Sequence, residues 1–168
     1  MSEYCLVNDV QKILPENVVI GTNLQSANVR VLQGDVEYWI QIAADIIDSH
    51  IGTIYRAPLI KYKEPDFSTN PVTFTEKYPP PIVIINARLA ASHIYDEIIM
   101  SDQEPGVSDW GKNQRALAFD DLKSIESGVI ILKGQVLTGR RFARQELLDN
   151  QRVTIQPALQ PQNRQPGL

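Results

Sequence analysis

The sequence has only one cysteine, Cys5, and two histidines among its 168 residues. A single cysteine excludes an internal disulfide framework and a zinc site built from several cysteines. His50 and His93 lie in separate predicted helices with no HExxH pattern, so we expect no metal site. The sequence also has no Gly-x-Ser-x-Gly motif and no other recognisable catalytic set. We therefore expect a protein that is not an enzyme and needs no cofactor.

Long apolar runs are missing as well. The longest uncharged apolar run, Tyr78–Ala87, is ten residues long and includes three prolines, whereas a membrane helix needs about 20 apolar residues. The first nine residues contain two acids and no lysine or arginine, unlike a secretory signal. With 43% hydrophobic residues, the chain is expected to be one soluble domain without membrane contact.

The chain has no excess of positive charge, since 16 Lys and Arg face 20 Asp and Glu. This balance argues against a protein that coats nucleic acid by electrostatics. The charge is uneven, because residues 133–168 contain six basic and only two acidic residues. Residues 151–168 are rich in Gln and Pro and should stay extended until a partner binds them. We predict a helical domain at 1–137 and a basic C-terminal tail at 138–168.

The fold class is predicted to be mainly α, a small bundle of about four helices. Apolar residues recur at steps of three and four over about 35–55, which is typical of a helix with one buried face. Shorter or similar patterns predict helices at about 8–14, 81–100 and 109–127. The 81–100 helix is apolar around most of its circumference and should be central or contact a second chain. The adjacent acids Asp96-Glu97 and Asp120-Asp121 are expected on solvated helix faces.

Two further segments carry structural expectations. The long loop 61–80 contains four aromatic residues and should protrude and dock, as a loop or a hairpin, on a neighbouring subunit or another protein. These candidate contact residues are Tyr62, Phe67, Phe74 and Tyr78. After the last helix, Val129–Leu132 is predicted to be a buried strand that could pair with Gln135–Leu137 as a short β-hairpin. Asp48 could pair with Arg56 or with Arg88.

The order of these motifs resembles one known family. The helix containing Ala43-Ala44-Asp45-Ile46-Ile47-Asp48 runs into Tyr55-Arg56-Ala57-Pro58-Leu59, and a later helix begins Pro80-Pro81-Ile82-Val83-Ile84 and reaches Ile94-Tyr95. This pattern, over about Tyr4 to Gly134, is similar to the head–tail adaptor (connector) proteins of tailed bacteriophages. Small residues such as Ala43, Ala87 and Ala90 would let the two long helices approach closely.

The resemblance implies a structural virion protein at the head–tail junction, assembled in the host cytoplasm. Such a protein forms a homo-oligomeric ring, commonly dodecameric, that bridges the capsid portal to the next neck or tail protein. Genomic DNA passes through the channel without sequence-specific binding. The resemblance also implies that the C-terminal tail binds the portal, and its candidate residues are Arg140, Arg141, Arg144, Arg152, Pro157, Leu159, Pro161, Arg164 and Leu168.

A second hypothesis is a small helical regulatory protein that binds nucleic acid through the same basic tail. It requires binding that weakens steeply with salt, because lysine and arginine contacts to phosphates release counterions. The acidic body argues against it.

Overall fold

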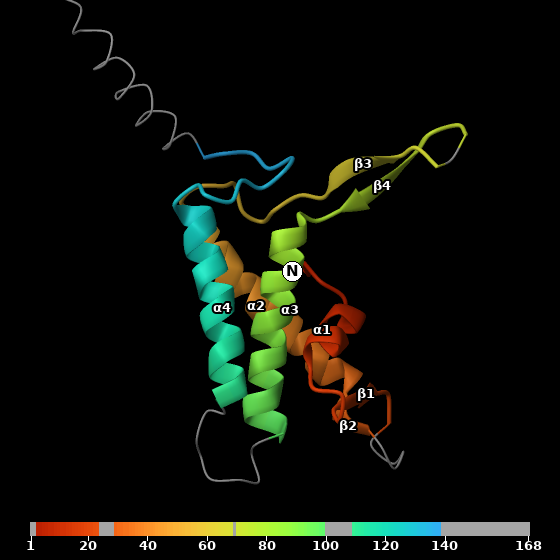
Figure 1. Cartoon of the computed structure of the whole chain (residues 1–168), viewed down its shortest axis with the longest axis vertical. Coiled ribbons are helices and arrows are strands. Elements are labelled where there is room, and N and C mark those ends of the chain that lie inside the picture. Colours follow the sequence, from red (N-terminus) through yellow and green to blue (C-terminus); the bar gives the residue numbers. More distant parts are fainter. Residues whose placement is uncertain (1–2, 24–28, 69, 100–108, 139–168) are drawn as a thin grey trace, which may run out of the picture. The chain divides into compact units, whose positions relative to one another are not determined.

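The computed structural model describes residues 3–23, 29–68, 70–99 and 109–138 (Figure 1). The chain divides into two units, Met1–Thr138 and Gly139–Leu168. The second unit, and with it every candidate portal-binding residue from Arg140 to Leu168, lies outside the described residues. The fold described below is that of the first unit.

The described part is mainly α-helical, as predicted, with four α-helices and two small two-stranded sheets (Figure 1). A π-helical turn continues the third helix. In chain order the elements are α1 (Val7–Ile13), β1 (Val19–Gly21), β2 (Val29–Leu32), α2 (Gln33–Ile51), β3 (Tyr62–Asp66), β4 (Thr73–Lys77), α3 (Pro80–Ile94), η1 (Tyr95–Ile99) and α4 (Asp109–Glu126).

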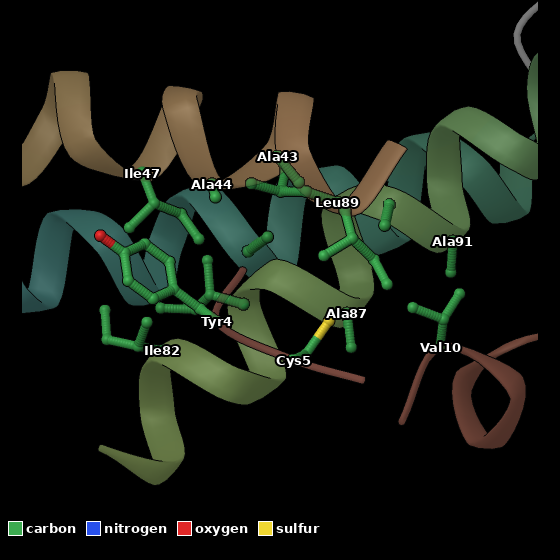
Figure 2. Packing of buried hydrophobic residues seen from close by; sticks show 14 of the residues in the cluster. Tyr4, Cys5, Val10, Ala43, Ala44, Ile47, Ile82, Ala87, Leu89 and Ala91 are labelled. Atoms are coloured by element: carbon green, nitrogen blue, oxygen red, sulfur yellow. The ribbon is translucent and has the colours of Figure 1, made fainter. Parts of the chain in front are cut away.

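Helix α3 is the central element, which is the first of the two alternatives predicted from its apolar circumference. It contacts α1, α2 and α4, and nine of its fifteen residues are buried. Helix α2 supplies the facing stripe predicted by its periodicity, with Val36, Ile40, Ala43, Ala44, Ile47 and Ile51 buried. Small residues on both helices lie in the same buried cluster, where they leave room for Leu89 and Ile47 (Figure 2). Close packing of α2 on α3 therefore builds the core.

Two helix ends follow local rules, and the end of α2 departs from the prediction. Proline occupies the first turn of α3, where no intrahelical N–H partner is needed. Gly128 follows α4 with a φ of 80°, a conformation that glycine adopts without steric cost. Helix α2 ends at Ile51 and not near Tyr55 as predicted, because Tyr55 leaves the helix to form a β-bridge with Leu137.

The hairpin expected at Val129–Leu137 is not formed, and this prediction was wrong. The backbone of its second half pairs instead with the segment after α2: Arg56 N–H donates to Val136 O, and Thr138 N–H to Ile54 O, both at 2.8 Å. Leu132 N–H donates to the phenol oxygen of Tyr55 at 3.2 Å. With these backbone groups engaged elsewhere, the two halves cannot form a ladder with each other.

The antiparallel hairpin of the described structure lies in the segment that was predicted to be a protruding loop or hairpin. Strands β3 and β4 pair in full register from Tyr62↔Lys77 to Asp66↔Thr73. A second sheet, the parallel pair β1–β2, was not predicted. No helix in the described residues is both long and apolar enough to cross a membrane.

Candidate functional site

The hairpin β3–β4 is the part of the described structure that projects most clearly from the helices (Figure 1). All five residues of β4 are exposed. Two ion pairs cross between the strands, with Lys77 Nζ at 2.9 Å from Glu64 Oε2 and Lys63 Nζ at 4.0 Å from Glu76 Oε1. The Lys77 ammonium holds the pKa of the Glu64 carboxyl below its usual range. Exposed pairs of this kind align the strands but stabilise them little.

Two of the four predicted aromatic contact residues anchor the base of the hairpin. Tyr78 packs edge-on against Tyr4, with 5.0 Å between ring centroids. Tyr62 lies under the Lys133 ammonium, which is 5.0 Å from its ring centroid. Both rings are partly buried. Contacts within one chain therefore explain these two aromatic residues without a partner protein.

The other two aromatic residues are exposed. Phe67 is 80% exposed and Phe74 is 63% exposed, and Val72 between them is 45% exposed. We call these three residues the hairpin tip. Exposed aromatic groups gathered on a projecting element mark interaction sites more often than isolated exposed residues do.

The base of the hairpin is fixed by the segment that follows α4. Gly134 has a φ of 72°, and a Cβ at this position would lie 2.6 Å from Cβ of Tyr62, so both the turn and the close approach require glycine. The Gln135 side chain accepts from Ile60 N–H at 3.0 Å and donates to Ile60 O at 2.7 Å. These contacts set the direction in which the hairpin leaves the bundle.

A groove of about 380 Å³ lies beside the hairpin base. Its lining is mainly apolar and includes charged residues of both signs. The lining residues are Glu3, Tyr4, Cys5, Leu6, Asp9, Lys61, Glu76, Lys77, Tyr78, Pro80, Val83 and Ile84. Sequence reasoning missed this groove, although the apolar position Ile84, on the outer side of a helix already rich in core residues, was a signal for it.

Cys5 lies in the wall of this groove, and its thiol is buried. The thiol donates to Oδ1 of Asn86 at 2.8 Å. Burial, with smaller contributions from Asp9 and Glu3, raises the pKa of Cys5 from 9.0 to about 12. A neutral thiol that donates a hydrogen bond has the character of a structural cysteine.

We expect the thiol of Cys5 to react slowly in the folded protein. Because its pKa is raised, the thiolate fraction at pH 8 should be roughly 1000-fold lower than in the unfolded chain, where the pKa is ordinary. Alkylation by iodoacetamide at pH 8, followed by mass spectrometry, should therefore be at least that much slower in buffer than in denaturing urea. Equal rates in the two solvents would show that Cys5 is not held as described.

The far end of α3 contains an ion pair that the sequence did not predict. Arg115 of α4 pairs with Asp96 in the π-helical turn, and the Asp96 carboxylate packs directly against Gly111. The side chain of Asp96 is only 9% exposed, so the expected solvated face was wrong at this position. The carboxylate lies against the first turn of α4, where the helix dipole favours negative charge.

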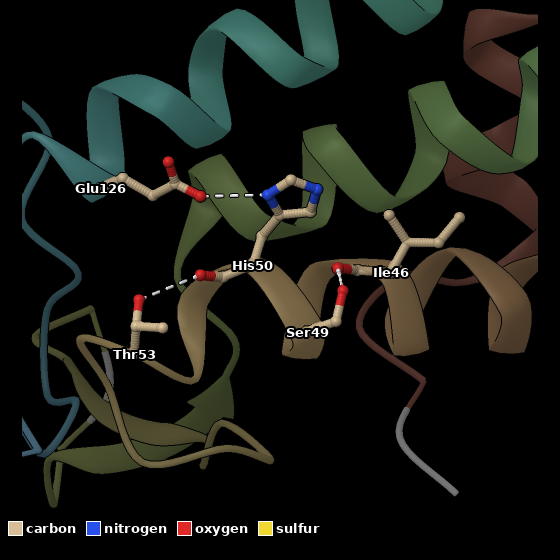
Figure 3. Close-up of polar contacts among 5 residues, drawn as sticks. All are labelled: Ile46, Ser49, His50, Thr53 and Glu126. Carbon is tan, nitrogen blue, oxygen red and sulfur yellow. Dashed lines mark hydrogen bonds and ion pairs between the residues drawn. The ribbon is translucent and has the colours of Figure 1, made fainter.

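The two histidines make structural contacts. His93 stacks on Trp39 with 4.9 Å between ring centroids, and burial is the main cause that lowers its pKa. His50 Nδ1 lies 3.0 Å from Oε1 of Glu126, which ties the ends of α2 and α4 together (Figure 3). The described residues contain no group of three or more His, Cys, Asp or Glu side chains that could hold a metal ion.

Comparison of the chain with protein-family models, curated proteins and solved structures gives no match.

Proposed function

We propose that this protein is a structural component of a phage neck, an adaptor that forms a ring between the capsid portal and the next neck or tail protein. The observation that carries the proposal is the hairpin tip: Phe67 and Phe74 are exposed on a hairpin that leaves a well-packed helical bundle. The motif order from Tyr4 to Gly134 that resembles head–tail adaptors supports the same function.

The stability of the hairpin favours a contact with another protein. A two-stranded hairpin in water is only marginally stable without a surface to pack on. Here its principal contacts are between its own strands, and its tip displays phenylalanine to solvent. Such an element is best explained as one half of a protein–protein contact.

In the proposed assembly the parts of the chain have separate roles. The helical bundle forms the body of the ring around the DNA channel, and its excess of acids repels the genome and prevents it from sticking. The basic tail binds the portal. The protein performs no catalysis and needs no cofactor, and it acts at the head–tail junction of the virion after assembly in the host cytoplasm.

The test is the mass of the purified protein in solution, measured alone and mixed with a portal ring. We expect a ring, or a monomer that assembles only on the portal. Deleting Gln151–Leu168 should leave the far-UV circular dichroism of the body unchanged and abolish portal binding, because the deletion removes two of the tail arginines and all of its prolines.

A matched control is a full-length chain in which residues 151–168 are replaced by a Gly/Ser sequence of equal length, which should behave like the deletion. Portal binding by the truncated chain would contradict the tail assignment. A protein that ignores the portal but binds DNA with a steep salt dependence would instead support the regulatory function.

A further inference from the structure

The described structure contains both an apolar projection and an apolar groove. The hairpin tip consists of Phe67, Val72 and Phe74, and the groove beside the hairpin base includes Leu6 and Ile84. We propose that the hairpin tip of one copy inserts into the groove of a second copy, which gives a head-to-tail contact between subunits.

The tip cannot fill the groove of its own chain. The groove is lined by Lys77 and Tyr78 at the base of the hairpin, and the first rung of the ladder is Tyr62↔Lys77. At a rise of roughly 3.4 Å per residue, Phe74 lies about 10 Å and Phe67 about 17 Å along the hairpin from that rung. The two surfaces can therefore meet only between copies.

Both sides of the proposed contact expose apolar side chains. Leu6 is 70% exposed and Ile84 is 44% exposed in the groove, while Phe67 of the tip is 80% exposed. An aromatic side chain buries about 150–250 Å² in a contact, so the tip contributes on the order of 400 Å². With a similar area on the groove, one contact buries about 800 Å² in total, less than the roughly 1,200–2,000 Å² of a standard stable interface, so we expect association that depends on concentration.

One ion pair can also form across the contact, between an acid near the hairpin tip and a lysine at the groove. Asp66 precedes Phe67 at the end of β3, and hydrogen bonds from Ser68 hold the pKa of its carboxyl below the usual range. Residues 67–73 contain no charged side chain, so the end of the hairpin is acidic.

Lys61 supplies the positive charge at the groove. Its ammonium lies over the Tyr78 ring, 5.3 Å from the centroid, and no carboxylate of the described residues forms an ion pair with it. The other charged groups of the groove have contacts within the chain: Lys77 with Glu64, Glu76 with Lys63, Asp9 with Lys12 and Glu3 with Gln41. Lys61 is thus placed to receive Asp66 of an incoming hairpin.

The contact is heterologous, because different surfaces of the two copies meet. Repeating it either closes a ring or extends a filament, depending on the rotation between subunits. A closed ring rests on the proposed function, whereas the tip-in-groove contact does not.

The experiment uses two full-length variants, Phe67→Ser with Phe74→Ser at the tip, and Ile84→Asp in the groove. Sedimentation velocity over a wide concentration range should show association of the wild-type protein and monomers for each variant. Mixing the two variants should give one-to-one dimers that grow no further, since each variant retains one intact surface. Leu117→Ser on α4, where Leu117 is 47% exposed, is the matched control and should associate like the wild type.

Two results would overturn the inference: a wild-type protein that stays monomeric over the whole range, or variants that form no dimers when mixed. A tip-to-tip contact is one arrangement that gives the second result. All substituted side chains are at least 44% exposed, and circular dichroism with thermal unfolding confirms that each variant folds.

Charge reversal gives an independent readout. Lys61→Glu and Asp66→Lys should each weaken association by about tenfold, and the double variant should recover most of the loss. If association of the double variant does not recover, the ion pair between Lys61 and Asp66 is not part of the contact. Portal binding is measured separately. Self-association without portal binding would support the tip-in-groove contact and reject the proposed function. A portal-bound ring formed by the tip variant would support the proposed function and reject the tip-in-groove contact.

Discussion

Replacing Leu89 by alanine is expected to lower the free energy of unfolding by about 2–5 kcal/mol. Leu89 lies on the central helix α3, is fully buried and belongs to the cluster that α3 shares with α2 (Figure 2). Ala43 and Ala44 of α2 lie in the same cluster, and alanine has no spare side-chain atoms with which to fill a cavity. The loss should therefore fall toward the upper end of that range.

Urea unfolding followed by circular dichroism measures this loss. Leu117→Ala on α4 is the matched control, because Leu117 is 47% exposed and a surface substitution usually changes stability by less than about 0.5 kcal/mol. Equal effects of the two substitutions would mean that α3 is not the centre of the core.

Replacing Asn86 by aspartate is expected to destabilise the protein strongly and in a pH-dependent way. Asn86 is fully buried on α3. Its Nδ2 donates to Ile40 O at 3.1 Å, and its Oδ1 accepts from the Cys5 thiol at 2.8 Å. An aspartate here would lose the donor and place a carboxylate away from water, at a cost of about 3–5 kcal/mol at pH 7.

The sign of the pH dependence follows from burial. A buried carboxyl has a raised pKa in the folded state, whereas in the unfolded chain it titrates near 3.9. The added cost of the charge is therefore absent below about pH 4 and grows as the pH rises toward the folded-state pKa. Urea unfolding at pH 4 and pH 7, each compared with wild type at the same pH, should show a larger loss at pH 7.

Asn113→Asp is the control for this prediction, because Asn113 is an exposed asparagine near the start of α4. A carboxylate there costs nothing and can gain slightly from the helix dipole. A loss for Asn86→Asp that is the same at both pH values, or no larger than that of Asn113→Asp, would show that residue 86 is not sealed from solvent.

The contacts of the polar side chains were the least predictable part of the fold. From the sequence, the partner of Asp48 was predicted to be Arg56 or Arg88. In the structure the Tyr4 phenol donates to Asp48. Arg88 pairs instead with Asp121 at 2.8 Å. Tyr4 is 44 residues from Asp48. A separation of that size leaves no periodic signal, because it depends on how the N-terminal segment packs across α2.

The aromatic residues of the candidate site were also only partly predictable from the sequence. Tyr62, Phe67, Phe74 and Tyr78 were predicted as one contact set, and the structure separates them into an anchored pair and an exposed pair. The separation depends on Tyr4 and Lys133, which approach the hairpin base from opposite ends of the first unit. The groove beside that base combines residues 3–9, 61, 76–84, so it exists only after the chain has folded.

The sequence by itself determined where the helices lie. Apolar residues that recur every three or four positions all fall on one face of a helix, so this signal is local in the chain. It also limited α3 to two places, the centre of the fold or a contact with a second chain, since a helix apolar all round cannot face water, and the structure places α3 at the centre. Only the tertiary structure decided where the β-hairpin lies, because Val136 and Thr138 pair with Arg56 and Ile54 across a long stretch of chain. Strand pairing and side-chain contacts are chosen by competition among distant partners, and that competition is settled in three dimensions.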